Sequence, residues 1–383
     1  MLTTISSSAL DPRDLPSGQP VSWRRLMRVA RIEHRAALIT ILVAFVVLVV
    51  AIVIGRDAVN SSYASYLAAG CTRAHPINLA VCANTSNTFA DIPSFTPIVI
   101  ALRLFPLVIG AFVGAPLIAR EVEMGTFRFA WTQGVGRTRL FLVTLTMLAL
   151  VVTLVAVVLG LLLGGWYVHP WAVINPGVGS QWQAGLFTTT WWMTPVWTLF
   201  ALSLGALVGA VIKRTVAAIA ATALIVGGVL YGATQFLPRI LDLGAVASSR
   251  ILIGDFPIGV INANATRGLG PAGSYLARGW FTGPSGQPLA SRAANMVRDH
   301  AVSLYEKSNG YNDPQAASRW LTIHHYTYWL AYQPADHFWI LQAVVGLVVL
   351  AFTALCAYAT VRRIRGRRAS HGRTGRTSVQ ISS

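Results

Sequence analysis

Six long apolar stretches constrain the fold of this chain more than any other feature of its sequence. Each approaches the roughly 20 residues that a helix needs to cross the roughly 30 Å hydrocarbon core of a bilayer, where every backbone polar group must be satisfied within the segment. The sequence therefore predicts an all-α membrane protein with six transmembrane helices. The predicted spans are residues 37–54, 98–119, 140–165, 192–212, 215–233 and 338–361.

The composition agrees with a membrane protein. Hydrophobic residues make up 54% of the 383 residues and charged residues only 11%, against roughly 25% charged residues in soluble domains. The formal net charge is nevertheless +17. Such a charge indicates either a nucleic-acid partner or a bias that sets membrane topology, and the positions of the basic residues separate the two.

The basic residues gather on one side of the predicted membrane. With the N-terminus in the cytoplasm, nineteen of the thirty lie in cytoplasmic segments, ten in the longer external segments, and one, Arg103, inside a span. This distribution follows the positive-inside rule and predicts that both termini are cytoplasmic. The densest clusters, within residues 24–35 and 362–368, also suit anionic lipid headgroups. Membrane lipid is thus an expected partner, and nucleic acid is not.

The two cytoplasmic ends differ in pattern. Residues 1–21 are expected to form a disordered tail, and residues 362–383 a basic tail. Residues 22–36 carry apolar side chains at helical spacing and arginines on a different face, which predicts an amphipathic helix in the cytoplasmic interface. A merely basic flank is the alternative. The side chains expected at the interface are Trp23, Arg24, Arg28, Arg31 and Arg35.

Two of the predicted external loops show recognisable features. Residues 55–97 contain Cys71 and Cys82. Because an outward-facing loop permits disulfide formation, a bridge between them is favoured over the alternative of two free thiols. Residues 166–191 are rich in aromatic side chains, which is typical of the membrane interface rather than of a binding site.

The third external segment, residues 234–337, is extended enough to form a small domain between the fifth and sixth spans. A hairpin is predicted over residues 275–289, around a Gly-Pro-Ser-Gly turn, and a helix over residues 289–307. A segment of this length is expected to have a role, either at the exit of a pathway or toward a partner. Its sequence shows no recognisable chemistry.

No nucleotide-binding motif occurs in the chain. The pattern Gly-x-x-x-x-Gly-Lys-Ser/Thr is absent, so any ATP must be bound by another subunit, and the chain is not expected to be an enzyme or to hold a cofactor. The histidines of the external segment 234–337 have no metal-ligand spacing, so no metal site is expected. They are His300, His324, His325 and His337.

Two features lie inside the predicted spans. Arg103 is an ionisable residue about six positions from the outer end of the second span, and it has either a functional role or an ordinary interfacial position reached by its long side chain. Glycine pairs at four-residue spacing recur in three spans and can allow close helix packing, although such matches also arise by chance. They are Gly110/Gly114, Gly160/Gly164 and Gly205/Gly209.

The most specific stretch is the predicted cytoplasmic loop between the second and third spans. Residues 119–139 read AREVEMGTFRFAWTQGVGRTR. This loop resembles that of type-2 ABC exporter permeases of the actinobacterial branch. The matching positions are Glu121, Glu123, Gly125, Thr126, Thr132, Gln133, Arg137 and Arg139. The six-span layout, the interfacial helix and the QPADHFW stretch at residues 333–339 add to the resemblance.

The resemblance implies a function and partners. Residues 120–139 would form a coupling helix on a separate ATP-binding cassette ATPase subunit, with Glu121 and Glu123 facing that subunit. The chain would pair with a second copy or a sister permease in the bacterial plasma membrane and export a hydrophobic drug, peptide or lipid-like compound. An ion-driven secondary transporter and a non-transporting membrane protein with an external sensing domain are the alternatives. The extended segment 234–337 departs from the family pattern.

Overall fold

The computed structural model describes residues 31–32, 34–70, 95–124, 137–165, 182, 184–243, 247–250, 275–306 and 314–371. Several predicted features therefore lie outside the described residues: the N-terminal tail, most of the interfacial helix and most of the loop at residues 166–191. The predicted site residues among them are Trp23, Arg24, Arg28, Cys71, Cys82, Gly125, Thr126, Thr132 and Gln133.

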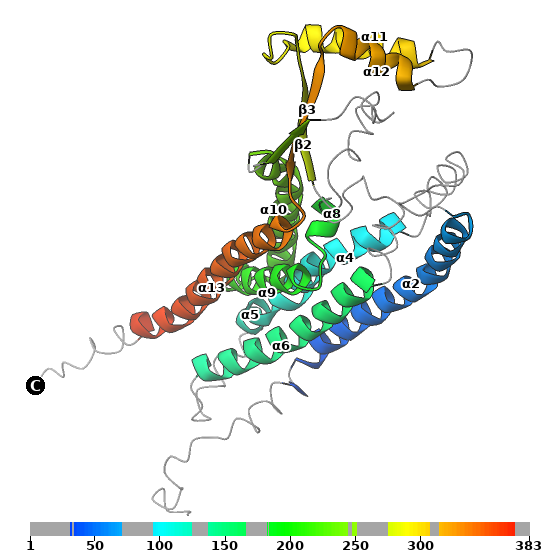
Figure 1. Ribbon diagram of the computed structural model, residues 1–383. Helices are drawn as coiled ribbons and strands as arrows, with labels where there is room; N and C mark the ends of the chain where they lie inside the picture. Colours follow the sequence, from blue (N-terminus) through cyan, green and yellow to red (C-terminus); the bar gives the residue numbers. More distant parts are fainter. Residues whose placement is uncertain are drawn as a thin grey trace, which may run out of the picture.

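Six helices among the described residues are long and apolar enough to cross a membrane, which confirms the predicted all-α membrane fold (Figure 1). Five are single helices, and the second span is built from three segments in succession. The single helices are α2 Arg35–Ala68, α6 Arg137–Leu163, α9 Met193–Ile212, α10 Thr215–Leu243 and α13 His337–His371. The segments of the second span are α4 Phe95–Ile109, the π-helix η1 Gly110–Gly114 and α5 Pro116–Glu123.

Two helices run beyond the ends that hydropathy predicts. Helix α2 continues to Ala68, past the predicted end of its span at residue 54, and α10 continues to Leu243, past residue 233. The added turns of α2 contain charged and hydroxyl residues that no longer suit lipid. Packing supports these turns, since Val59 is buried in the core cluster and Tyr63 and Tyr66 pack against it. The helices therefore project beyond the apolar layer at this end of the bundle.

Helix α9 is the central helix of the bundle. In its most apolar window 72% of the residues are buried, against 17% in α2 and in α10. It packs against α4, η1, α5, α6, α10 and α13. A helix that is apolar on every side and enclosed by neighbours is a core element, so the peripheral helices are held together largely through α9.

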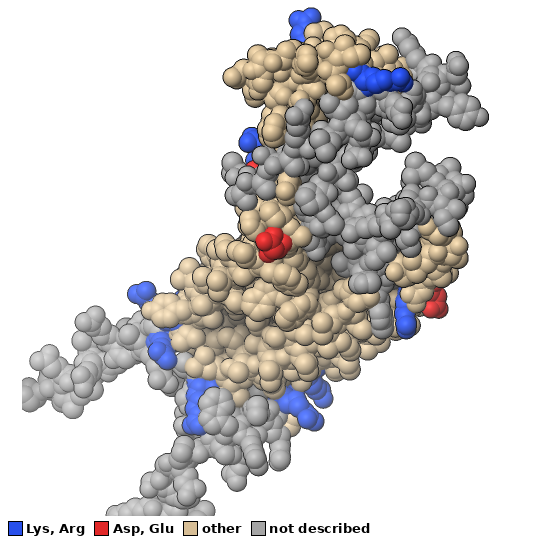
Figure 2. Space-filling view, in the orientation of Figure 1, with Lys and Arg blue, Asp and Glu red and all other residues tan. Residues whose placement is uncertain are grey.

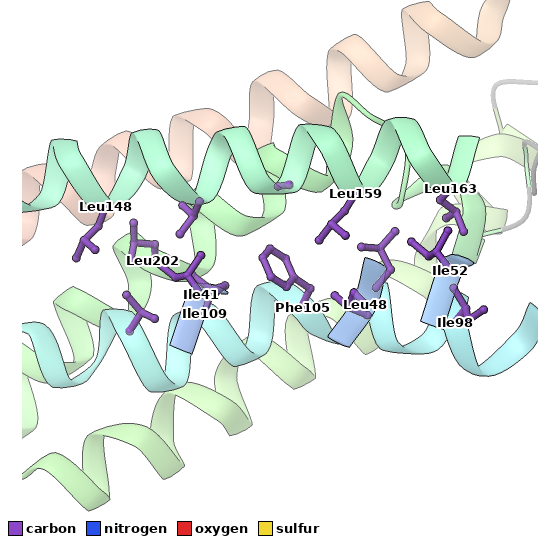
Figure 3. Packing of buried hydrophobic residues seen from close by; sticks show 14 of the residues in the cluster. Ile41, Leu48, Ile52, Ile98, Phe105, Ile109, Leu148, Leu159, Leu163 and Leu202 are labelled. Carbon is purple, nitrogen blue, oxygen red and sulfur yellow. The ribbon is translucent and has the colours of Figure 1, made fainter. Parts of the chain in front are cut away.

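The largest buried cluster joins α2, the second span and α6 (Figure 3). Ile52, Phe105 and Leu159, one from each, are at most 1% exposed. In contrast, α2, α10 and α13 present large apolar side chains on their outer surfaces, including Leu224 at 78% exposed and Leu347 at 64%. In a membrane protein such surfaces face lipid or another subunit.

The bundle carries a projection beyond its end (Figure 1). It is a three-stranded antiparallel sheet in the order β1-β3-β2, capped by two helices. The strands are β1 Ala247–Arg250, β2 Tyr275–Thr282 and β3 Thr327–Gln333, and the helices are α11 Ser291–Glu306 and α12 Pro314–Ile323. The helix predicted over residues 289–307 is thus present as α11.

The predicted hairpin at residues 275–289 forms, but only next to its turn. Gly283 N–H donates to Gln287 O, Leu289 N–H donates to Phe281 O, and Thr282 bridges Pro288. The long partner of β2 is β3. The turn is local, whereas the sheet forms between segments far apart in the sequence.

Aromatic packing fills the joint between the sheet and its capping helices. Phe281 and Tyr328 are cross-strand partners with ring centroids 4.7 Å apart, and burial raises the pKa of the Tyr328 phenol. Trp320 of α12 lies between the rings of His300 and His324, at 4.4 and 4.7 Å. These two histidines therefore pack on an indole ring.

Candidate functional site

The described parts of the predicted coupling loop lie at the end of the bundle where α2 and α6 begin and where α5, α9 and α13 end. Glu121 and Glu123 belong to the last turn of α5, and Arg137 and Arg139 to the first turn of α6. Lysine and arginine side chains gather at this end (Figure 2). Both flanks of the loop thus lie at the same end of the bundle, while the loop's centre lies outside the described residues.

Glu123 is bonded within the chain. Its Oε2 accepts a hydrogen bond of 2.8 Å from the backbone N–H of Thr215, the first residue of α10. The first N–H groups of a helix have no partner in the helix itself and carry a partial positive charge, so a carboxylate stabilises them. Glu123 therefore joins the end of α5 to the start of α10.

The turn between α9 and α10 has only two residues, which is why it can meet α5 so closely. Lys213 adopts a left-handed conformation, with φ 61°, and its N–H donates to Gly209 O at 3.2 Å. This ends α9 in a single residue, as helix C-termini commonly do. Arg214 then leads directly into α10, and its charge lies near the Glu123 carboxylate.

The other predicted site residues of this region are only partly tested by the geometry. Glu121 is partly exposed and, like Arg139, takes part in an interaction within the chain. Of the predicted interfacial helix, Arg31 is exposed and Arg35 is the first residue of α2. The roles of all these residues remain predictions.

A glycine seam, defined here as Gly110, Gly114, Gly205 and Gly209, joins the second span to α9 by direct backbone contact. A Cβ on Gly110 would fall 2.7 Å from Ala201 O, and one on Gly114 would fall 2.6 Å from Leu202 O. A Cβ on Gly205 or Gly209 would meet the backbone of Gly110 or Ala115 more closely still. Two of the three predicted glycine pairs therefore mark one shared helix contact.

The third pair is engaged at one position only. A Cβ on Gly160 would fall 2.6 Å from the Cα of Trp191, whereas one on Gly164 would meet nothing within 4 Å. The contact of Gly160 is with the turn that precedes α9. Among the described residues, this pair therefore does not mark a contact between two helices.

The seam coincides with an irregularity in the second span. Pro106 and Pro116 flank η1, and each lacks the N–H that an α-helix would use. Between them the chain widens to a π-turn, in which Ala115 N–H donates to Gly110 O at 2.9 Å. Such turns are rare in proteins, and those that occur are often found at functional sites. The span is thus bent and widened where it touches the central helix.

Gln342, a residue that the sequence analysis missed, ties α13 to the turn before α9. Its side chain is fully buried, and its Nε2 donates to Phe187 O at 2.9 Å and to Thr190 Oγ1 at 3.1 Å. Buried polar groups in an apolar layer need such partners. A signal was available, because Gln342 is the only amide side chain in the predicted span 338–361.

Replacing Gln342 by leucine is expected to lower the free energy of unfolding by about 1–3 kcal/mol, because the Phe187 carbonyl loses a buried partner. Chemical denaturation of the protein in detergent measures the change. Thr353→Val is the matched control, since the Thr353 hydroxyl bonds only to Val349 O of its own helix. Equal losses in the two variants would contradict a role for Gln342 between helices.

A second buried glutamine fixes the base of the projection. Gln333 is the last residue of β3; its Nε2 donates to Leu241 O of α10 at 3.1 Å, and its Oε1 lies 3.1 Å from Nδ1 of His337, where α13 begins. The sheet is therefore attached to the ends of both α10 and α13. A displacement of these helices would be carried into the projection.

Arg103 lies beside the short helix α8 Ala184–Phe187, with its Nη1 3.6 Å from the position of a Cβ on Gly185. Its side chain is neither fully buried nor fully exposed. The role of Arg103 therefore stays a prediction.

The comparison with known families bears on this arrangement. Residues 42–237 match the family described as ABC-2 membrane transporter related. The chain belongs to this family. No curated protein and no solved structure matches it. The matched range contains most of the first five spans, the loop at residues 120–139 and the glycine seam, but neither the projection nor α13.

Membership of the ABC-2 family states what kind of component the chain is. It is a multi-pass membrane protein and the permease of an ABC transporter, a transport component that is generally not catalytic itself. The family implies an ATPase partner and usually a paired permease. The predicted resemblance to type-2 permeases is thereby confirmed at the level of the family.

Proposed function

We propose that this ABC-2 permease forms the translocation pathway of an exporter in the bacterial plasma membrane, with both termini in the cytoplasm. Residues 120–139 are the coupling segment that docks on a separate ATPase subunit. Orientation follows from the excess of basic residues at the end of the bundle that carries this segment. ATP-driven movement of the ATPase is transmitted into the spans from that end.

The observation that carries the proposal is the hydrogen bond from Thr215 N–H to Glu123. It links the last turn of α5 to α10, so a displacement of the coupling segment moves the second and fifth spans together. From α5 and η1 the displacement reaches α9 through the glycine seam, where backbone contact leaves no compressible side chain between the helices. The central helix then shifts relative to α13 and α6.

The permease pairs with a second copy of itself or with a sister permease to form the pathway. Among the described residues, nothing covers the apolar face of helix α10, and a Cβ on Gly228 or Gly232 would meet none of their atoms within 4 Å. Small residues at four-residue spacing allow another helix to approach closely in lipid. Pairing through this face would place the fifth spans of two permeases together along the pathway.

The proposed cargo is a hydrophobic drug, peptide or lipid-like compound moved outward. All thirteen acidic residues lie outside the six predicted spans. Ion-driven transporters normally place acids or polar broken helices near the midplane, so the composition favours ATP over an ion gradient as the energy source. Apolar span surfaces suit apolar cargo.

The docking role is tested by charge reversal at Glu121. The variant Glu121→Lys is expected to lower the affinity for the ATPase subunit about tenfold, or 1.4 kcal/mol, because an acidic contact becomes repulsive. Co-purification of the tagged permease with its ATPase, titrated with salt, measures the loss. Arg363→Glu, a reversal on α13 at the same end of the bundle, is the control. Wild-type recovery of the ATPase with Glu121→Lys would rule out docking through this segment.

A further inference from the structure

A groove of about 600 Å³ lies between the first turns of α6 and the last turns of α13. Its walls are apolar, with Leu142 and Leu145 on one side and Tyr358 on the other, and Arg362 and Arg365 stand at one end. Its volume lies within the roughly 300–1,000 Å³ of small-molecule sites. The groove plays no part in the proposed coupling route.

The groove lies at the level in the bilayer where the acyl chains of one leaflet meet the headgroups. The apolar span of α6 begins at Phe141, just before Leu142, and the predicted sixth span ends at residue 361, just before Arg362. The aliphatic wall therefore lies at the level of acyl chains, and the two guanidinium groups lie at the level of headgroups. Tyr358, which is 63% exposed, stands between these levels, as interfacial tyrosines do.

The two helices that line the groove, α6 and α13, carry positively charged side chains and no negatively charged ones. Neither α6 nor α13 contains an aspartate or glutamate anywhere in its sequence. Arg362 and Arg365 are three residues apart, so their side chains leave the same face of α13 and can engage one anion together. Guanidinium groups hold phosphate through paired hydrogen bonds, and a phosphate of a lipid headgroup would arrive at this depth.

We propose that this groove binds one anionic phospholipid, with an acyl chain along Leu145 and Tyr358 and the phosphate at Arg362 and Arg365. The lipid fills the space between two helices that otherwise pack mainly on α9 rather than on each other. Because α6 follows the loop at residues 120–139, the bound lipid fixes the position of its first turns. The site stands independently of the proposed coupling role.

The predicted amphipathic helix at residues 22–36 is a less suitable occupant. Its predicted apolar face would suit an apolar wall, but docking there would bring Arg24, Arg28, Arg31 and Arg35 toward the two arginines of the groove. Like charges at close range oppose such docking. An anionic lipid satisfies both the apolar wall and the positive end.

The test is a lipid titration of the full chain, read by native mass spectrometry and by the melting temperature. Phosphatidylglycerol is the probe, and phosphatidylcholine and glycerol 3-phosphate are the comparison ligands. Wild type is expected to retain one phosphatidylglycerol. Since an arginine near an anionic headgroup contributes about fivefold in affinity, Arg362→Gln/Arg365→Gln is expected to weaken binding about 30-fold.

Two further variants separate the groove from general surface charge. Arg363→Gln removes an exposed charge from the same turn outside the groove and is expected to change affinity by less than about twofold. Leu145→Trp fills the apolar wall and is expected to lower lipid retention with the arginines intact. Equal binding of phosphatidylcholine, an equal loss with Arg363→Gln, or displacement of the lipid by glycerol 3-phosphate would each overturn the proposal.

Discussion

Replacing Gly205 by alanine is expected to destabilise the protein by about 3 kcal/mol, in the upper part of the range for overpacked sites. The added Cβ would lie 2.9 Å from Ala115 N and closer still to Gly110 O. Both neighbours are backbone atoms of the second span, so no side chain can rotate away. Relief requires α9 and η1 to separate, which opens the contact on which the bundle's central helix depends.

The control for this prediction is Gly164→Ala, which has the same chemical change at a glycine that meets nothing within 4 Å. It is expected to alter stability by no more than about 0.5–1 kcal/mol, and in the stabilising direction. Melting temperature and the midpoint of unfolding in detergent measure both variants. A Gly205→Ala protein as stable as wild type would show that the backbone contact is absent.

The six spans can be predicted from sequence because their cause is local. Apolar length and the placement of arginines are properties of each segment, and the membrane imposes helix on any segment that meets them. The exact ends of the helices are predicted less well from the sequence. Helix α2 persists to Ala68 because Val59, Tyr63 and Tyr66 pack its later turns against the core, although hydropathy stops predicting a span at residue 54.

The contacts between segments are much harder to predict. Gly160/Gly164 and Gly205/Gly209 have the same spacing, yet only the second pair lies wholly against another helix. The difference depends on which face each helix turns toward a neighbour, and that is decided by the whole bundle. Likewise, Glu123 bonds to Thr215, 92 positions later in the chain, and no local pattern predicts that pairing.

The bond between Glu123 and Thr215 also changes the expected role of the acidic pair. The resemblance implies that both glutamates face the ATPase, but the structure gives the carboxylate of Glu123 a partner inside the permease. We therefore expect substitution of Glu123 to impair transmission from α5 to α10, a role that the resemblance does not imply. Glu121 also takes part in an interaction within the chain, and its docking role stays a prediction.

Glu123→Ala is accordingly expected to leave the ATPase bound. The rate of ATP-driven transport is expected to fall about tenfold. Loss of the carboxylate removes a capping interaction at the start of α10 and frees that end of the helix from α5. Glu123→Gln, which keeps an oxygen acceptor, is expected to retain most of the transport rate. Stability should fall only slightly, since the site is at an exposed helix end.

Spin labels at Arg120 on α5 and Val216 on α10, both exposed, measure this transmission directly. In the wild-type complex the two labels are expected to move together, so their separation stays constant during ATP turnover. In Glu123→Ala the separation is expected to broaden and vary with nucleotide, because the ATPase then displaces α5 alone. A constant, narrow distance in the alanine variant, with the ATPase bound, would show that α5 and α10 are coupled by other contacts.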